Sequence, residues 1–324
     1  QDFTTALFVK EGIELLVTIG GDDTASTANR LTKYLAAHQV NIRNIHVPKT
    51  IDNDLPLPEG IPTFGFTSAK EMGVTIGKVI KAEASTTQNW YLLMSMGREA
   101  GHLAFEIGKG IHASMIIIPE MFNKTQITID KIVRLIISSM IKRRIVGQKF
   151  GVVVVGEGIF HFLQDEDIAS SGITFDYDAH GHPELSEVSK AHVISKILKN
   201  RLKELNLDII CRPVEVGYSL RCVDPSAFDL TYCTTLGIGV KKLYDEGHSG
   251  CMVAVNLEEE VIPVYLKDVE DEHGKIRTRL VNIDKEVVRQ TLTENIYYLT
   301  AQDRSLARKW LADPEPFEYE RILG

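Results

Sequence analysis

The stretch IELLVTIGGDDT, residues 13–24, points to the fold class of the chain. Its apolar first part, residues 13–19, predicts a buried strand, which Gly20 and Gly21 bring to an end. Alanines and leucines recur at helical spacing over residues 25–38 and predict a helix there. A strand, a glycine turn and a helix start are typical of an open α/β sheet, in which ligands bind at the carboxyl ends of the strands.

Two aspartates follow the glycines, at a helix start whose backbone N–H groups would attract an anion. A phosphate beside Asp22 and Asp23 would be repelled unless a cation lay between them, and Mg²⁺ bridges carboxylate and phosphate oxygens. Asp23 or Thr24 could instead simply cap the helix, as such residues often do. This stretch alone leaves both interpretations open.

Composition narrows the class of protein. The chain has 324 residues, of which 44% are hydrophobic and 25% charged, an ordinary globular composition with enough length for two domains. No apolar run approaches a membrane span, so we expect a cytoplasmic protein that contacts no membrane. The net charge of −8 argues against nucleic-acid binding. Four cysteines lack zinc-site spacing and are expected to be reduced core thiols: Cys211, Cys222, Cys233 and Cys251.

A second polar turn, PKTIDND at residues 48–54, follows a short strand expected at residues 42–47. Lys49 could hold a phosphate as a point charge, and Asp52 could take the proton of a substrate hydroxyl. Asp54 could orient water, a metal ion or the base. A polar loop with Asx turns remains the alternative for this stretch alone.

Two further strands end in polar residues. The strand expected at residues 90–95 leads into Met-Gly-Arg at residues 96–98, and the guanidinium of Arg98 suits a phosphoryl group. The strand expected at residues 114–119 leads to Glu120, which could accept sugar hydroxyls or cap the next helix.

A later strand, expected near residues 208–217, contains Arg212 and is followed by Tyr218 and Arg221. Hydrophobic periodicity predicts the remaining elements. We expect helices at residues 69–81, 99–112, 127–144, 188–205, 228–243 and from 285 onward, and strands at 150–155 and 251–256. Phosphoryl transfer needs cations and backbone for phosphate, a metal carboxylate and a base for the acceptor hydroxyl, and these strand ends supply such groups.

The polar turns resemble those of the 6-phosphofructokinases, and within them the pyrophosphate-dependent branch. The motifs occur in the family's order and cover most of the chain: GGDDT (20–24), PKTIDND (48–54), MGR (96–98), IPE (118–120), GYSLR (217–221) and PSAFD (225–229). The resemblance implies an α/β protein of two Rossmann-like lobes with mostly parallel sheets and an active site in the cleft between them. A phosphoryl-donor lobe would hold residues 1–64 and about 222–274, and a fructose 6-phosphate lobe residues 65–221 and about 275–324.

The resemblance also implies roles for single residues. Asp52 would be the general base for the fructose 1-hydroxyl, with Thr50 and Asp54 beside it, and Asp22 would be the Mg²⁺ carboxylate. Arg98 would steady the transferring group and, with Thr50 and Asp52, contact fructose 6-phosphate, whose other ligands would be Met96, Gly97, Glu120, Arg212, Tyr218 and Arg221. The donor would be held by Gly20, Gly21, Asp23, Thr24 and Lys49. The arginine that Arg212 matches reaches in from a neighbouring subunit, which implies a homodimer or higher homo-oligomer.

The phosphoryl donor depends on two positions. ATP-using relatives carry glycine where Asp23 stands and usually where Lys49 stands. A carboxylate there repels a nucleotide's α-phosphate, while a lysine offers a partner to a short diphosphate. The resemblance therefore implies Mg²⁺-dependent, reversible phosphoryl transfer from pyrophosphate to the 1-hydroxyl of fructose 6-phosphate, giving fructose 1,6-bisphosphate and phosphate in glycolysis.

Two departures from the family pattern motivate alternatives. Family members have a further strand and a Gly-Gly-Asp turn ahead of the first stretch, so residues before Gln1 or another chain would supply that part of the phosphate-binding edge. Asn89 stands where many relatives have an arginine. These departures motivate the alternative of a non-catalytic regulatory or sugar-phosphate-binding subunit on the same fold. An ATP-dependent phosphofructokinase is a separate alternative.

Overall fold

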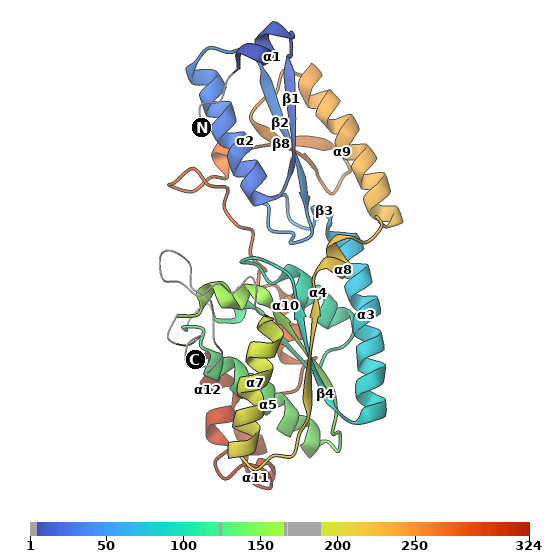
Figure 1. Ribbon diagram of the computed structural model, residues 1–324, viewed down its shortest axis with the longest axis vertical. Helices are drawn as coiled ribbons and strands as arrows, with labels where there is room; N and C mark the ends of the chain where they lie inside the picture. Colours follow the sequence, from blue (N-terminus) through green and yellow to red (C-terminus); the bar gives the residue numbers. More distant parts are fainter. Residues whose placement is uncertain (1–4, 123–124, 165–166, 168–188) are drawn as a thin grey trace. The chain divides into compact units, whose positions relative to one another are not determined.

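The computed structural model describes residues 5–122, 125–164, 167 and 189–324. The chain divides into two compact units (Figure 1). Unit 1 comprises Gln1–Ala69 and Val223–Arg279, and unit 2 comprises Lys70–Cys222 and Leu280–Gly324. The chain passes between units after residues 69, 222 and 279, whereas the boundaries expected from the sequence lie after residues 64, 221 and about 274.

Unit 1 is built on a sheet with the strand order β1-β2-β8-β9, and β3 also pairs with β2. Its strands are β1 (Leu15–Gly20), β2 (Arg43–Thr50), β3 (Phe64–Gly65), β8 (Cys251–Val255) and β9 (Val261–Tyr265). The pairings of β2 with β1, β3 and β8 are parallel, and β9 pairs antiparallel with β8. Because β1 and β2 run in the same direction, their carboxyl ends lie at the same edge of the sheet.

Helices α2 (Asp22–Ala37) and α9 (Ala227–Asp245) cover opposite faces of this sheet (Figure 1). Alternation along β8 explains the two layers, since successive strand residues point to opposite faces. Met252 packs in one buried cluster with Ala25 and Ala28 of α2, whereas Val253 packs in another with Leu236 of α9.

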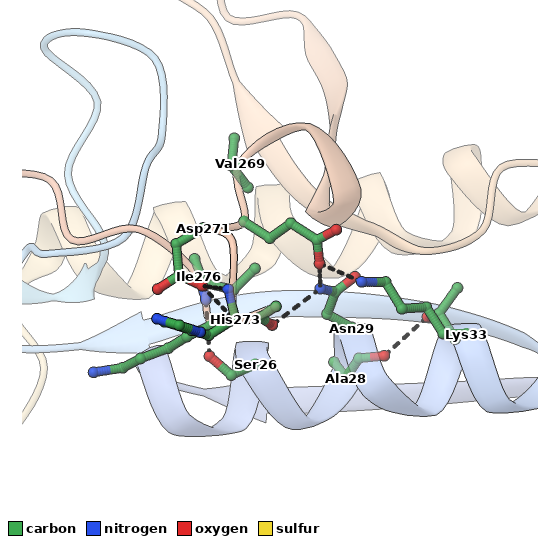
Figure 2. A network of polar contacts seen from close by, with 12 residues as sticks. Ser26, Ala28, Asn29, Lys33, Val269, Asp271, His273 and Ile276 are labelled. Carbon is green, nitrogen blue, oxygen red and sulfur yellow. Dashed lines mark hydrogen bonds and ion pairs between the residues drawn. The ribbon is translucent and has the colours of Figure 1, made fainter.

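A loop after β9 is fixed along α2 by the polar network that Figure 2 shows. The Ile276 N–H donates to Ser26 Oγ at 3.0 Å, and Lys33 Nζ lies 2.5 Å from a Glu270 carboxylate oxygen, to which Asn29 also donates. Ser26 and Asn29 are buried under this loop. The middle of α2, from Ser26 to Lys33, is therefore held by the loop as well as by the sheet.

Unit 2 contains a wholly parallel sheet with the order β5-β6-β4-β7. Its strands are β4 (Trp90–Ser95), β5 (Met115–Ile117), β6 (Gly151–Gly156) and β7 (Cys211–Val216). Its main helices are α4 (His102–Gly110), α5 (Ile129–Ile145), α7 (Lys190–Glu204) and all but the first turn of α3 (Phe66–Thr87), which begins in unit 1. Helix α3 packs closely on α4 at Gly73. A Cβ added to this glycine would lie only 2.7 Å from Ile107 Cγ1, so the absence of a side chain permits the close approach.

Short helices complete the described chain. They are α1 (Ala6–Lys10), η1 (Pro119–Phe122), η2 (Glu157–Phe162), α8 (Tyr218–Arg221), η3 (Leu266–Asp268), α10 (Glu286–Thr293), η4 (Ala301–Asp303), α11 (Arg304–Ala307), η5 (Glu315–Phe317) and α12 (Tyr319–Leu323). The mostly helical segment expected from residue 285 is thus a series of short helices separated by loops. In the part of the chain that the structure describes, no helix has the length and apolar character to cross a membrane.

The expected mixed α/β class with mostly parallel sheets is confirmed, and three local expectations are wrong. Strand β2 continues through Pro48 to Thr50, because β3 pairs with its last two residues. Helix α2 begins at Asp22 with Gly21 at its N-cap, so neither Asp23 nor Thr24 is the cap. All four cysteines are free, but Cys222 and Cys233 are exposed and so are not core thiols.

Candidate functional site

The glycine turn and the PKTIDND segment meet at the carboxyl edge of unit 1. Gly20 pairs with Pro48 in the parallel ladder between β1 and β2. A Cβ on Gly21 would lie 3.4 Å from Thr50 Cβ, and a Cβ on Gly20 would lie only 2.6 Å from Thr24 Cβ. Gly20 therefore permits the first turn of α2 to pack directly on the end of β1.

Hydrogen bonds between side chains and the backbone shape the loop that carries Asp52. The Asp52 N–H donates to Thr50 Oγ1 at 3.1 Å, while Thr63 Oγ1 donates to the Thr50 carbonyl at 2.7 Å. Asn53 adopts a left-handed conformation with φ of 57° and accepts the Thr63 N–H at 3.0 Å through its side chain. Asparagine tolerates this conformation better than most residues. The loop thus has a defined shape, with the Asp52 side chain partly exposed.

Arg279 supports this loop, although it is far away in the sequence. Its Nε donates to the Asn53 carbonyl at 3.0 Å, one guanidinium nitrogen donates to the Ile61 carbonyl at 2.9 Å, and its backbone N–H donates to the Asp54 carbonyl at 2.6 Å. Burial lowers the pKa of Arg279, and the nearby carboxylate of Asp54 opposes that shift. Asp54 is itself only 3% exposed. Arg279 was not among the residues expected from the sequence, because it lies in an irregular segment with no motif of its own.

Besides Asp52 and Asp54, the charged motif residues at this edge are two aspartates and a lysine. Asp22 and Asp23 occupy the first turn of α2, where negative charge interacts favourably with the helix dipole. Lys49 is exposed near the end of β2. Among the described residues, no group of three or more His, Cys, Asp or Glu side chains forms a metal site. A single carboxylate such as Asp22 still fits Mg²⁺, which often takes one or two carboxylates and completes its coordination with phosphate oxygens and water.

In unit 2, the Met-Gly-Arg turn at the end of β4 is fixed by a carboxylate that follows the neighbouring strand. Gly97 has a φ of 146°, and a Cβ there would lie 2.8 Å from the Ala100 carbonyl oxygen, so only glycine fits well. The Gly97 N–H donates to Glu157 Oε1 at 3.2 Å, and Glu157 pairs with Lys190 at 3.3 Å. Glu157 was not expected in the site, although its place directly after a buried strand was the available signal.

Glu120 lies in η1, and its side chain is only 7% exposed. Its Oε1 accepts the N–H groups of Gly101 at 2.9 Å and Val281 at 3.0 Å. Burial raises the pKa of Glu120, and these hydrogen bonds oppose the increase. Within the described chain, Glu120 Oε2 is buried without a hydrogen-bond partner. Glu120 therefore links two backbone segments and keeps one oxygen that could accept a ligand hydroxyl.

Four other residues expected in the site are exposed in unit 2. Tyr218 and Arg221 lie in α8, with the Arg221 guanidinium carbon 5.8 Å from the centre of the Tyr218 ring. Arg212 lies on β7, the last strand in the order of this sheet. Arg98 is exposed directly after Gly97. The structure thus places Gly20, Gly21, Asp22, Asp23, Thr24, Lys49, Thr50, Asp52 and Asp54 in unit 1, and Met96, Gly97, Arg98, Glu120, Arg212, Tyr218 and Arg221 in unit 2.

These mostly parallel sheets, with glycine turns and charged groups at their carboxyl edges, define an α/β protein of the doubly wound class. Comparison with known proteins identifies the family. Residues 3–244 match the family described as Phosphofructokinase. The chain belongs to the phosphofructokinase family.

Two curated relatives carry the name pyrophosphate--fructose 6-phosphate 1-phosphotransferase. The chain is 35% identical over 317 residues to the one from Thermotoga maritima, covering 96% of this chain and 73% of that protein. It is 36% identical over 286 residues to the one from Naegleria fowleri, covering 86% of this chain and 64% of that protein. A crystal structure of a pyrophosphate-dependent phosphofructokinase from Marinobacter aquaeolei superimposes with a TM-score of 0.64 at 19% identity, covering 94% of this chain and 69% of that one. This last likeness concerns the fold alone.

Proposed function

We propose that the protein is a pyrophosphate-dependent 6-phosphofructokinase. It transfers a phosphoryl group reversibly from pyrophosphate to the 1-hydroxyl of fructose 6-phosphate, in glycolysis and in the cytoplasm. The observation that carries the proposal is the combination of Lys49 with Asp22 and Asp23 at the edge of the sheet that holds the glycine turn. The names of the two curated relatives support the same substrates.

Unit 1 would bind the donor. The N–H groups of the glycine turn and the Lys49 ammonium would hold pyrophosphate, and Asp22 would hold a Mg²⁺ ion whose charge offsets that of the phosphates. Asp52 would accept the proton of the fructose 1-hydroxyl as the hydroxyl oxygen attacks the phosphorus atom. The bond from that phosphorus to the bridging oxygen breaks, and phosphate leaves. Thr50, which accepts the Asp52 N–H, would keep the base in place.

Unit 2 would bind the sugar phosphate. Arg221, Tyr218 and Arg98 are exposed and offer hydrogen-bond donors suited to phosphate. Oε2 of Glu120 would accept a sugar hydroxyl, and Gly97, fixed by Glu157, would present its backbone to the ligand. Arg212, exposed on β7, would contact the substrate of a neighbouring subunit in a homo-oligomer. Size-exclusion chromatography with light scattering tests this last point, because a monomer would exclude it.

The donor assignment can be tested with two substitutions. If a nucleotide α-phosphate sat about 5 Å from the Asp23 carboxylate, the repulsion at an effective dielectric of about 20 would be roughly 3 kcal/mol per unit charge. Asp23→Gly should therefore permit use of ATP and change pyrophosphate use little. Lys49→Gly should lower turnover with pyrophosphate by orders of magnitude, because it removes a cation from the donor itself.

The measurement is kcat/KM for pyrophosphate and for ATP in the wild type, in both single variants and in the double variant, at saturating Mg²⁺. Lys33→Gly is the matched control, since Lys33 also belongs to unit 1 but lies beyond the first turns of α2 and pairs with Glu270. An unchanged ratio of the two donors in Asp23→Gly would show that the carboxylate does not select the donor.

A further inference from the structure

A buried histidine lies directly behind the glycine turn. His46 is in the middle of β2 and has no solvent-exposed surface. Its Nε2 lies 3.1 Å from the Gly20 carbonyl oxygen, and its Nδ1 lies 3.0 Å from Thr18 Oγ1. Both contacts are made to β1, where Thr18 is the register partner of His46.

The two contacts fix the protonation of the imidazole. A carbonyl oxygen only accepts hydrogen bonds, so Nε2 carries the proton and donates it to Gly20. Nδ1 is then the acceptor that faces the Thr18 hydroxyl, and Asn44 Oδ1 lies 3.5 Å from the same hydroxyl oxygen. Burial lowers the pKa of His46 to about 4, so the ring is neutral at physiological pH. The second ring nitrogen thus has a partner that selects one tautomer, as in many functional histidines.

The hydrogen bond to Gly20 also determines where the next N–H points. The carbonyl of Gly20 and the N–H of Gly21 belong to one planar trans peptide, in which the two groups point in opposite directions. Because His46 holds the carbonyl toward the buried side, the Gly21 N–H is directed away from it. Gly21 is the N-cap of α2, where N–H groups bind anions.

We propose that His46 is a positioning residue for the donor phosphate, which it orients through the peptide between Gly20 and Gly21. This inference rests on the proposed function, because it assigns the glycine turn to the phosphoryl donor.

Two variants of His46 separate positioning from simple packing. His46→Leu keeps an apolar side chain in the buried site but removes the donor to Gly20. His46→Gln keeps an N–H donor that can reach the same carbonyl and should restore binding. Asn44→Leu is the matched control: Asn44 is equally buried on the same strand and also lies within 3.5 Å of the Thr18 hydroxyl, but its side chain donates to the Ala28 carbonyl and to Thr32 Oγ1 of α2 rather than to Gly20.

The test measures dissociation constants of pyrophosphate, ATP and fructose 6-phosphate by calorimetry in the presence of Mg²⁺, with thermal unfolding as the check on folding. In His46→Leu we expect the dissociation constant of pyrophosphate to rise about tenfold, the size of one lost hydrogen bond, and that of fructose 6-phosphate to stay unchanged. Asn44→Leu should lower the unfolding temperature without changing either constant.

The outcomes are distinct for the two proposals. Unchanged pyrophosphate binding in a folded His46→Leu variant overturns the role of His46, and so does a parallel rise in Asn44→Leu. If the wild type binds ATP and not pyrophosphate, the proposed donor is wrong, and the ATP constants of the same variants decide the role of His46. Failure of His46→Gln to restore binding would also contradict positioning by a hydrogen bond.

Discussion

The acidic residues of the candidate site differ in how far they are exposed. Asp54 is 3% exposed and lies near the Arg279 guanidinium. Glu120 is 7% exposed and accepts two backbone N–H groups. Asp52 is partly exposed and lies in a loop whose shape is fixed by Thr50 and Thr63. Of these three carboxylates, Asp52 is best placed to exchange a proton with a substrate.

Replacing Asp52 should therefore affect the chemical step more than binding. We expect Asp52→Ser to lower kcat in both directions by ~10²–10⁴-fold, the usual contribution of a general base, with the affinity for fructose 6-phosphate close to normal. Steady-state kinetics in the two directions measure this. Asp245→Ser is the control, because it removes an exposed carboxylate at the end of α9. Wild-type turnover in Asp52→Ser would exclude Asp52 as the base.

Glu120 should make stability depend on pH in a definite direction. Burial raises its pKa above the usual 4.5, so in the window above that value the native protein retains a proton that the unfolded chain has released. The free energy of unfolding then falls as the pH rises through this window. Glu120→Gln cannot titrate, so its stability relative to the wild type should increase with pH there and be constant below. Urea unfolding across this range is the measurement, and a difference independent of pH would contradict the raised pKa.

At the scale of elements, the close packing of β1 against α2 determines the shape of the glycine turn. Gly20→Ala would place a Cβ 2.6 Å from Thr24 Cβ, so the start of α2 must move. We expect a loss of about 1–3 kcal/mol in the free energy of unfolding and weaker binding of the donor. Chemical denaturation and donor titration measure the two effects.

The matched control for Gly20→Ala is Gly237→Ala in α9. A Cβ on Gly237 meets no atom within 4 Å, so this change should stabilise the protein by about 1 kcal/mol through helix propensity. If Gly20→Ala were as stable as the wild type and bound the donor equally well, the turn would be less tightly packed than described.

The elements show which features a sequence can predict. Buried parallel strands are continuous apolar runs, so β4 was predicted with its observed bounds, and the other predicted strands overlap the observed ones. Strand β9 was missed, because its five residues include Pro263, which disfavours a strand prediction, and because it pairs antiparallel at the end of the sheet. The start of α2 and the end of β2 were misplaced, since tertiary contacts with Thr50 and β3 decide them.

The motif residues of the candidate site could be predicted from the sequence, but most of the residues that support them could not. Motif residues such as Asp52 and Gly97 follow strands and could be found from the sequence. Arg279, Glu157 and His46 act through backbone groups of those motifs. Their partners come from other segments. The position of Glu157 directly after a buried strand was a local signal for that residue, whereas no local pattern indicates Arg279 or His46. The roles of all these residues in binding and catalysis stay predictions.

At the scale of the whole molecule, the chain forms two units, each with a sheet whose strands carry polar groups at their carboxyl ends. The groups proposed for the donor lie in unit 1, and those proposed for fructose 6-phosphate lie mainly in unit 2. Binding of each substrate should therefore respond to substitutions in its own unit.

Arg221→Ala should weaken binding of fructose 6-phosphate and leave pyrophosphate binding unchanged, because a contact with the sugar phosphate exists before the reaction. Calorimetry with each ligand measures this, and a fructose 6-phosphate affinity equal to that of the wild type would remove Arg221 from the site.

The proposed activity is transfer of a phosphoryl group from pyrophosphate to fructose 6-phosphate. The most direct measurement is kcat/KM of the wild-type protein with Mg²⁺ and fructose 6-phosphate, using pyrophosphate and ATP as alternative donors and detecting fructose 1,6-bisphosphate. The repulsion of roughly 3 kcal/mol expected from Asp23 corresponds to about a hundredfold preference. We therefore predict turnover with pyrophosphate that exceeds turnover with ATP by at least about that factor. Turnover with ATP alone, or binding of fructose 6-phosphate without turnover from either donor, would contradict the proposed function.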